Sequence, residues 1–248
     1  AQATQAPTPI RAEAERTLVL NDVAVPGAGL GESWLVVANT AGMPQSVAVR
    51  LYNPQTGVER GRWQSPPIAA NTALTVPVRD MLGSGPITTE GLSTQTLAIS
   101  GAVTLSVQHL IVRDGVVRAE AACGAALDGA PKLIGNVFGA SAQPAFVSVF
   151  EAVNTSGAPL ETRVVLLDPV NGLPTYSWVE TVPGFATRQI SIPQLEARVG
   201  AVIGGFWSRY TARIEGDARV RVRHRVFSGT AGIATDATVV CALSKTPE

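Results

Sequence analysis

Residues 39–44 read N-T-A-G-M-P, and residues 154–159 read N-T-S-G-A-P. The same spacing of 115 residues carries N-P-Q-T-G at 53–57 onto D-P-V-N-G at 168–172. Single residues match as well: Trp63 with Trp178, His109 with His224 and, after a three-residue shift, Cys123 with Cys241. Agreement at so many positions indicates an internal duplication. The sequence therefore predicts two copies of one domain, 17–128 and 131–244, after a flexible N-terminal segment, 1–16.

Within each copy, apolar and polar residues alternate with a period of two, which is typical of half-buried β-strands. The N-T-x-G and N/D-P-x-x-G sequences between these segments are turn formers, and D-G at 114–115 predicts a hairpin. About seven or eight strands per copy predict an all-β fold of two tandem antiparallel β-sandwiches. The predicted strands are 33–39, 46–53, 58–64, 72–78, 94–100, 102–112 and 116–122, then 145–153, 161–167, 173–181, 188–192, 209–215, 219–227 and 233–243. Short helical turns are predicted at 78–82 and 194–199.

The overall composition narrows the class of protein. Apolar residues make up 46% of the 248 residues and charged residues 15%, which is typical of a folded chain. No apolar run reaches the roughly 18 to 20 residues that a transmembrane helix needs. The formal net charge is zero, which argues against a nucleic-acid-binding protein. The chain opens with A-Q-A and no Met, a beginning expected of a mature exported chain.

The N-T-x-G turn that leads into an alternating strand, at 39–51, resembles the Ig-like modules that recur in bacterial cell-surface and periplasmic proteins. The resemblance covers about 20 residues per copy. It implies an Ig-like sandwich in an exported, non-enzymatic protein, and it carries over no functional residue. Two tandem sandwiches of this length are also similar in size to fimbrial assembly chaperones.

The two cysteines lie near the end of the last predicted strand of each copy. In an oxidising compartment Cys123 and Cys241 could form a disulfide between the domains, which would stabilise the chain by roughly 4 to 5 kcal/mol. Two buried free thiols are the equal alternative, and contacts with another chain are a third.

Few residues have a pattern that points to catalysis. His109 and His224 lie on the apolar side of their strands and far from the cysteines, so they are expected to be buried core residues rather than metal ligands. No catalytic or nucleotide-binding motif is present, and we expect no enzyme activity, no metal and no cofactor. Trp63 and Trp178 are expected in the core, with a sugar-binding platform as the alternative.

The most unusual stretch is R-V-R-V-R-H-R-V at 219–226, which places four arginines on one face of a strand. The preceding strand, 209–215, alternates in the same way. A three-residue loop at 216–218 would pair the two strands with all their apolar residues on one face. The predicted outer face then carries Arg209, Arg213, Arg219, Arg221, Arg223 and Arg225. Like charges would stand opposite one another there, so we expect either an ordinary solvated face or a binding surface for an anionic partner.

The first copy has Thr104, Ser106 and Gln108 where the second has Arg219, Arg221 and Arg223, so the fold itself does not require the charges. The sequence predicts a non-enzymatic binding or assembly protein outside the cytoplasm of a bacterium, in the periplasm or at the cell surface. The predicted partner is another protein subunit, which includes a second copy of the chain, or an anionic glycan or lipid surface. The alternative is a carbohydrate-binding module or a polysaccharide-active enzyme. On this reasoning, Arg221→Ser with Arg223→Gln would leave folding intact.

Overall fold

The structure is a computed structural model of the whole chain. It describes residues 15–24, 31–81, 94–102, 104–113, 116–120, 125–126, 132–139, 146–168, 170–199, 209–228 and 234–236. Strands dominate this part of the chain, and all the pairings between them are antiparallel. The fold is all-β, as the period-two pattern predicts. Neither described helix is long and apolar enough to cross a membrane.

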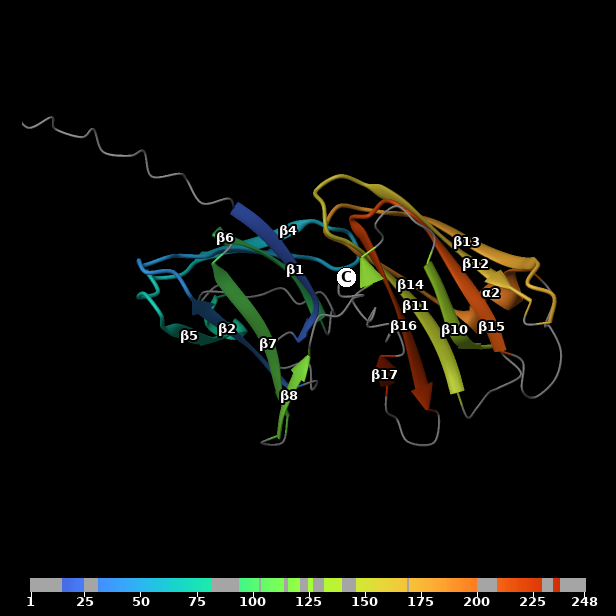
Figure 1. Ribbon diagram of the computed structural model, residues 1–248, viewed down its shortest axis with the longest axis horizontal. Helices are drawn as coiled ribbons and strands as arrows, with labels where there is room; N and C mark the ends of the chain where they lie inside the picture. Colours follow the sequence, from blue (N-terminus) through green and yellow to red (C-terminus); the bar gives the residue numbers. More distant parts are fainter. Residues whose placement is uncertain are drawn as a thin grey trace, which may run out of the picture.

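Four sheets form two lobes that lie side by side (Figure 1). In the first lobe the sheets have the strand orders β1-β6-β3-β4 and β5-β2-β7-β8. The helix α1 (Val78–Met81) follows β5. The strands are β1 (Glu15–Ala24), β2 (Glu32–Asn39), β3 (Ala48–Tyr52), β4 (Glu59–Gln64), β5 (Ala73–Pro77), β6 (Thr94–Ala102), β7 (Leu105–Arg113) and β8 (Val116–Glu120).

The second lobe has the orders β10-β15-β12-β13 and β14-β11-β16-β17, with β9 (Ala125–Ala126) also paired to β16. The helix α2 (Ile192–Val199) follows β14. Strand by strand, these orders correspond to those of the first lobe. The strands are β10 (Lys132–Phe138), β11 (Phe146–Asn154), β12 (Leu160–Leu167), β13 (Pro174–Val182), β14 (Thr187–Ser191), β15 (Arg209–Gly216), β16 (Val220–Ser228) and β17 (Ala234–Asp236).

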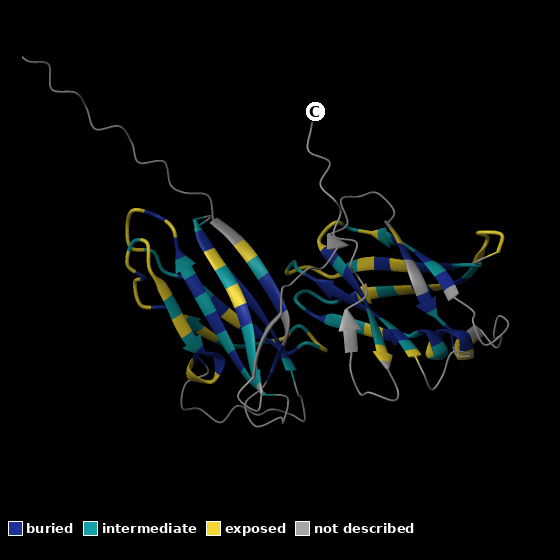
Figure 2. Ribbon diagram, turned by 60° about the horizontal axis from the view of Figure 1, so that its bottom comes forward, coloured by how far each residue is buried: buried dark blue, intermediate teal, exposed yellow. Residues whose placement is uncertain are grey.

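Each lobe encloses its own hydrophobic core between its two sheets. In the first lobe Leu35 of β2 packs with Leu97 of β6, and in the second Phe150 of β11 packs with Ile214 of β15. Burial alternates along β2, so that every second residue faces inward (Figure 2). This alternation is the reason that the strands are recognisable in the sequence.

The repeated N-T-x-G sequence closes one end of each lobe. Asn39 is buried, and its amide donates to the carbonyls of Met43 and Ile68 at 2.9 Å each. Asn154 does the same with Ala158 and Val182 at 2.7 and 2.9 Å. Each amide thus links its own N-T-x-G turn to the chain at Ile68 or Val182, and its hydrogen-bonding capacity is satisfied inside the protein.

The repeated N/D-P-x-x-G sequence turns the chain at the other end of each lobe. Asn53 Oδ1 accepts the backbone N–H groups of Gln55 and Thr56, and Asp168 accepts two equivalent bonds. Gly57 and Gly172 then adopt φ of 73° and 70°, a conformation that glycine adopts without a steric cost.

Three strands, β1, β9 and β10, were not predicted, and the last predicted strand is longer than the described one. β1 and β10 each contain a register shift, between Leu20 and Val23 and between Ile134 and Val137, which interrupts the period of two. β1 also includes residues 15 and 16, the last two residues of the predicted flexible segment. Of the predicted strand 233–243 only 234–236 is described as β17.

Candidate functional site

The two arginine-bearing strands do not form the predicted hairpin. β15 pairs with β10 and β12, whereas β16 pairs with β11, β17 and β9, so the two strands belong to opposite sheets of the second lobe. The connection at 217–219 crosses between the sheets, and Gly216, the last residue of β15, adopts a φ of 143°. The arginines therefore belong to two rows on opposite sheets of the lobe, and the prediction of one common surface is wrong.

The buried residues of β15 and β16 explain why the sequence wrongly predicted a hairpin. Tyr210, Ala212, Val220, Val222 and His224 are all buried, as predicted. They line one core because the two strands face each other across it. Alternation gives the inner face of a strand but does not tell whether its neighbour lies beside it or opposite it.

Arg209 and Arg213 belong to the row on β15, where the backbone of Arg209 stands opposite Phe138. Arg213 Nε donates to Glu215 at 2.7 Å. Arg163, on the neighbouring strand β12, lies 3.8 Å from the same carboxylate. This face therefore contains charge pairs rather than a block of like charges.

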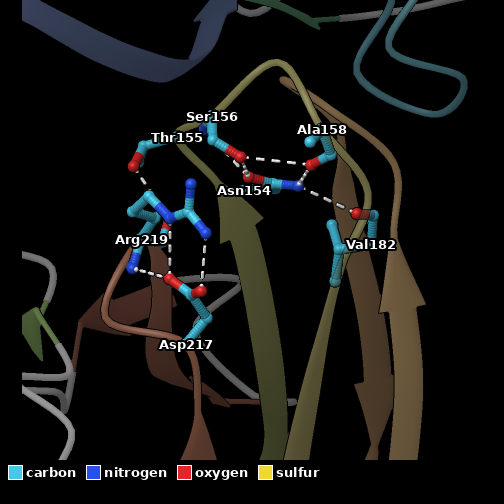
Figure 3. Close-up of polar contacts among 7 residues, drawn as sticks. All are labelled: Asn154, Thr155, Ser156, Ala158, Val182, Asp217 and Arg219. Carbon is cyan, nitrogen blue, oxygen red and sulfur yellow. Dashed lines mark hydrogen bonds and ion pairs between the residues drawn. The ribbon is translucent and has the colours of Figure 1, made fainter.

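Arg219 precedes β16 and is exposed. Its guanidinium contacts both carboxylate oxygens of Asp217, at 2.9 and 2.8 Å, and its backbone N–H donates to the same side chain (Figure 3). These bonds to Arg219 lower the pKa of Asp217 from 3.8 to about 2. The backbone carbonyl of Arg219 accepts the hydroxyl of Thr155, so this corner of the lobe is tied to the N-T-x-G turn.

The rest of the row on β16 surrounds a buried carboxylate. Glu151 of β11 is fully buried, and its Oε2 lies 3.4 Å from Arg225 and 3.9 Å from Arg223. Its Oε1 accepts the side-chain amide of Gln189 at 2.7 Å. Arg223 is 7% exposed, so the expectation that it stands on a solvated face is wrong. Burial, and next the charge of Arg223, lower the pKa of Arg221.

The lobes contact each other through an aromatic pair that the sequence analysis did not single out. Tyr52 of the first lobe stacks on Phe185 of the second, with ring centroids 4.4 Å apart. Around them Val19, Ala98 and Val153 form a small apolar cluster to which both lobes contribute. We call this contact the joint.

Backbone groups complete the joint. The N–H of Thr187 donates to the carbonyl of Pro54 at 2.7 Å, and the guanidinium of Arg188 donates to the carbonyl of Gln55. Gly57 lies so close to the second lobe that a Cβ there would stand 2.0 Å from the carbonyl oxygen of Gly184. The β3–β4 loop of the first lobe thus sits on the β13–β14 turn of the second.

Phe185 adopts a φ of 56°, which is unusual for a bulky side chain. The first lobe has Asn71 at the equivalent place, with a φ of 57°. Asparagine tolerates this conformation and phenylalanine does not favour it, so the difference in residue type between the lobes marks the joint. That difference is the signal that could have found the joint in the sequence.

The histidines have a structural role in both lobes. His109 Nε2 lies 3.0 Å from Ser33 Oγ, which accepts the backbone N–H of Ala24 at 2.8 Å. The second lobe repeats these bonds with His224, Ser148 and Phe138. Because β1 and β2 lie in different sheets, each serine ties the end of one sheet to the other. The prediction of inward-facing histidines is confirmed.

The remaining predictions concern the two tryptophans, the two cysteines and metal binding. Trp178 is buried and Trp63 packs against the core of the first lobe, so the two rings do not form an exposed platform for sugars. Cys123 and Cys241 lie outside the described residues, and their pairing stays a prediction. Within the described ranges, three or more histidine, cysteine or acidic side chains nowhere gather in a group that could hold a metal ion.

Comparison with known proteins gives weak matches only. No family model and no curated protein matches the chain. A candidate secreted protein of Parabacteroides distasonis ATCC 8503 matches with a TM-score of 0.22 and 9% identity over 89% of this chain and 85% of that one. A β-glucuronidase of Bacteroides uniformis matches with a TM-score of 0.18 and 11% identity over 89% of this chain, which spans 24% of that enzyme. At TM-scores this low neither match informs the function, and the proposals below rest on the residues of this chain.

Proposed function

We propose that the chain is a non-enzymatic extracytoplasmic protein that serves in binding or assembly. Its two Ig-like sandwiches, 17–128 and 131–244, descend from one duplicated domain. The equal strand orders of the lobes support this origin, as do the repeated asparagine amide and serine–histidine bonds. Resemblance to Ig-like modules of bacterial surface and periplasmic proteins supports the location.

The joint is the observation that carries the proposal. Domains of one chain move relative to each other unless their interface is specific. Here an aromatic pair, two hydrogen bonds to backbone carbonyls and a glycine at close approach fix the β3–β4 loop on the facing turn. An elongated body with a defined angle between its lobes suits a component that positions other subunits.

The arginines support a protein partner over an anionic glycan or lipid. Arg213, Arg219, Arg223 and Arg225 each lie within 4 Å of a carboxylate of the same lobe. An anion would have to displace these acids before it gained the bidentate contacts that arginine offers.

Fractionation of the cells that produce the protein tests the location and the partner class together. We expect the chain outside the cytoplasm, and cross-linked into complexes larger than its own 25.7 kDa. A cytoplasmic monomer would refute the proposal. In parallel, the purified chain is passed over heparin and mixed with phosphatidylserine vesicles. We expect no retention on either; retention that Arg219→Thr weakens would instead favour an anionic partner.

A further inference from the structure

The joint uses the β3–β4 loop of the first lobe and the β13–β14 turn of the second lobe. The equivalent loop of the second lobe and the equivalent turn of the first lobe take no part in the joint, and we call them the leftover loop and the leftover turn. The leftover loop is 168–173 of the second lobe, between β12 and β13. The leftover turn is 69–72 of the first lobe, between β4 and β5. Both are described in the structure except for residue 169.

The leftover loop has the same backbone as the docked one. Asp168 accepts the same pair of N–H groups as Asn53, and Gly172 has the φ of Gly57. A register shift precedes both loops, at Leu51/Tyr52 and at Leu166/Leu167. The tip of the leftover loop is apolar, because Val170 is 92% and Leu173 62% exposed.

The leftover turn likewise matches the turn that receives the loop. Thr72 N–H donates to the carbonyl of Ala69 as Ala186 N–H donates to that of Pro183. Asn71 and Phe185 share a positive φ. Ala69, Asn71 and Thr72 are exposed, so the turn is open to a partner.

The two leftover elements lie at opposite ends of the molecule. In Figure 1 the β12–β13 loop is at the far end of the second lobe, and the turn before β5 is at the far end of the first. A contact between two different surfaces of the same chain is heterologous, and such contacts generate open chains when they do not close into a ring. We propose that loop 168–173 of one copy docks on turn 69–72 of the next, so that copies associate head to tail with the geometry of the joint. This inference rests on the proposed assembly function and names a second copy as the partner.

The contact between copies is weaker than the joint, because it lacks the aromatic pair. Leu167 stands where the joint has Tyr52, and Asn71 where it has Phe185. Val170 and Leu173 contribute apolar area against Ala69 and the neighbouring Ala70. We therefore expect association that depends on protein concentration.

Sedimentation velocity on the full chain over a wide range of concentrations measures this association. The weight-average mass is expected to rise above 25.7 kDa with concentration. Val170→Asp should abolish the rise without affecting folding, because this side chain is exposed. Val179→Asp is the control. Val179 is also exposed, and its substitution adds the same charge to the same lobe but outside the loop.

A second variant tests the geometry by gain of function. Asn71→Phe with Leu167→Tyr places the aromatic pair of the joint between copies, and should tighten association by roughly tenfold. A photo-reactive benzoylphenylalanine at 71 should cross-link to residues 170–173 of another copy.

Three results would overturn the inference: a mass that stays at 25.7 kDa for both the natural chain and the aromatic variant, equal effects of Val170→Asp and Val179→Asp, or cross-links to another surface. None of them alone would refute the proposed function, because the chain could still be found in an extracytoplasmic complex with other subunits. That function fails on the fractionation result instead.

Discussion

The buried carboxylate of Glu151 allows a sharp test of how the second lobe tolerates its charges. Arg223→Gln removes one of its two arginines and leaves the carboxylate fully buried, with Arg225 and Gln189 as contacts. Breaking a buried ion pair by removing one partner costs about 3 to 5 kcal/mol. Because Arg225 is the closer arginine and stays, we expect a loss of about 3 kcal/mol. The earlier expectation that this substitution leaves folding intact is therefore revised.

The first lobe supplies the matched control. Register places Val36 and Gln108 where the second lobe has Glu151 and Arg223. The double variant Glu151→Val with Arg223→Gln copies that neutral pair. It should recover most of the lost stability, since it leaves no buried carboxylate and the side chain of Arg225, which is 20% exposed, can turn its charge to solvent.

Hydrogen-exchange mass spectrometry in a urea series is the assay, because it reports the opening free energy of each lobe separately. Peptides from β11 and β16 should lose protection in Arg223→Gln, and those from β2 and β7 should not. If the single variant keeps full protection, or if the double variant is the less stable of the two, the ion pair does not have the role argued above.

Three further predictions concern the turns and the joint. Asn154→Ala should destabilise the second lobe by about 2 to 4 kcal/mol in urea unfolding, because it removes several hydrogen bonds at a buried site. Gly57→Ala should widen the distribution of distances between the lobes measured by electron paramagnetic resonance, whereas Gly172→Ala, which has the same backbone strain but nothing within 4 Å, should not; equal effects would refute the close approach. In Arg219→Thr, NMR should find the pKa of Asp217 raised from about 2 toward 3.8. Because the natural pKa is lowered, any stabilisation by this pair is present above pH 3.8 and is lost as the pH falls toward 2.

The inner faces of the strands are predictable from the sequence, and their pairing is not. Alternation along 209–226 identifies Tyr210, Ile214 and Val222 as core residues. It does not identify the sheet to which each strand belongs, because two strands that face each other across a core have the same pattern as two strands of a hairpin. The register also depends on the path of residues 216–218, and a three-residue connection is compatible with both arrangements.

The joint was missed for a different reason. Repeats draw attention to what the copies share, and shared residues such as Asn39 and Asn154 hold the fold of each lobe. The aromatic pair of the joint lies instead at positions where the two lobes differ. Tyr52 and Phe185 have no aromatic counterpart in the other lobe, so a comparison by identity passes over them.

The backbone strain at Phe185 shows how the joint and the fold are linked. The turn requires a positive φ in both lobes, and Asn71 adopts it at little cost. A bulky residue in that conformation costs on the order of 1 to 3 kcal/mol, and such strain persists only where the surroundings determine the conformation. The surroundings here are the stacked ring of Tyr52 and the apolar cluster around it, which belong largely to the other lobe. Part of the stabilisation that the joint provides therefore offsets the backbone strain at Phe185. Phe185→Asn should relieve this strain and so stabilise the fold of the second lobe. The same substitution removes the stacked ring, so it should weaken the contact between the two lobes.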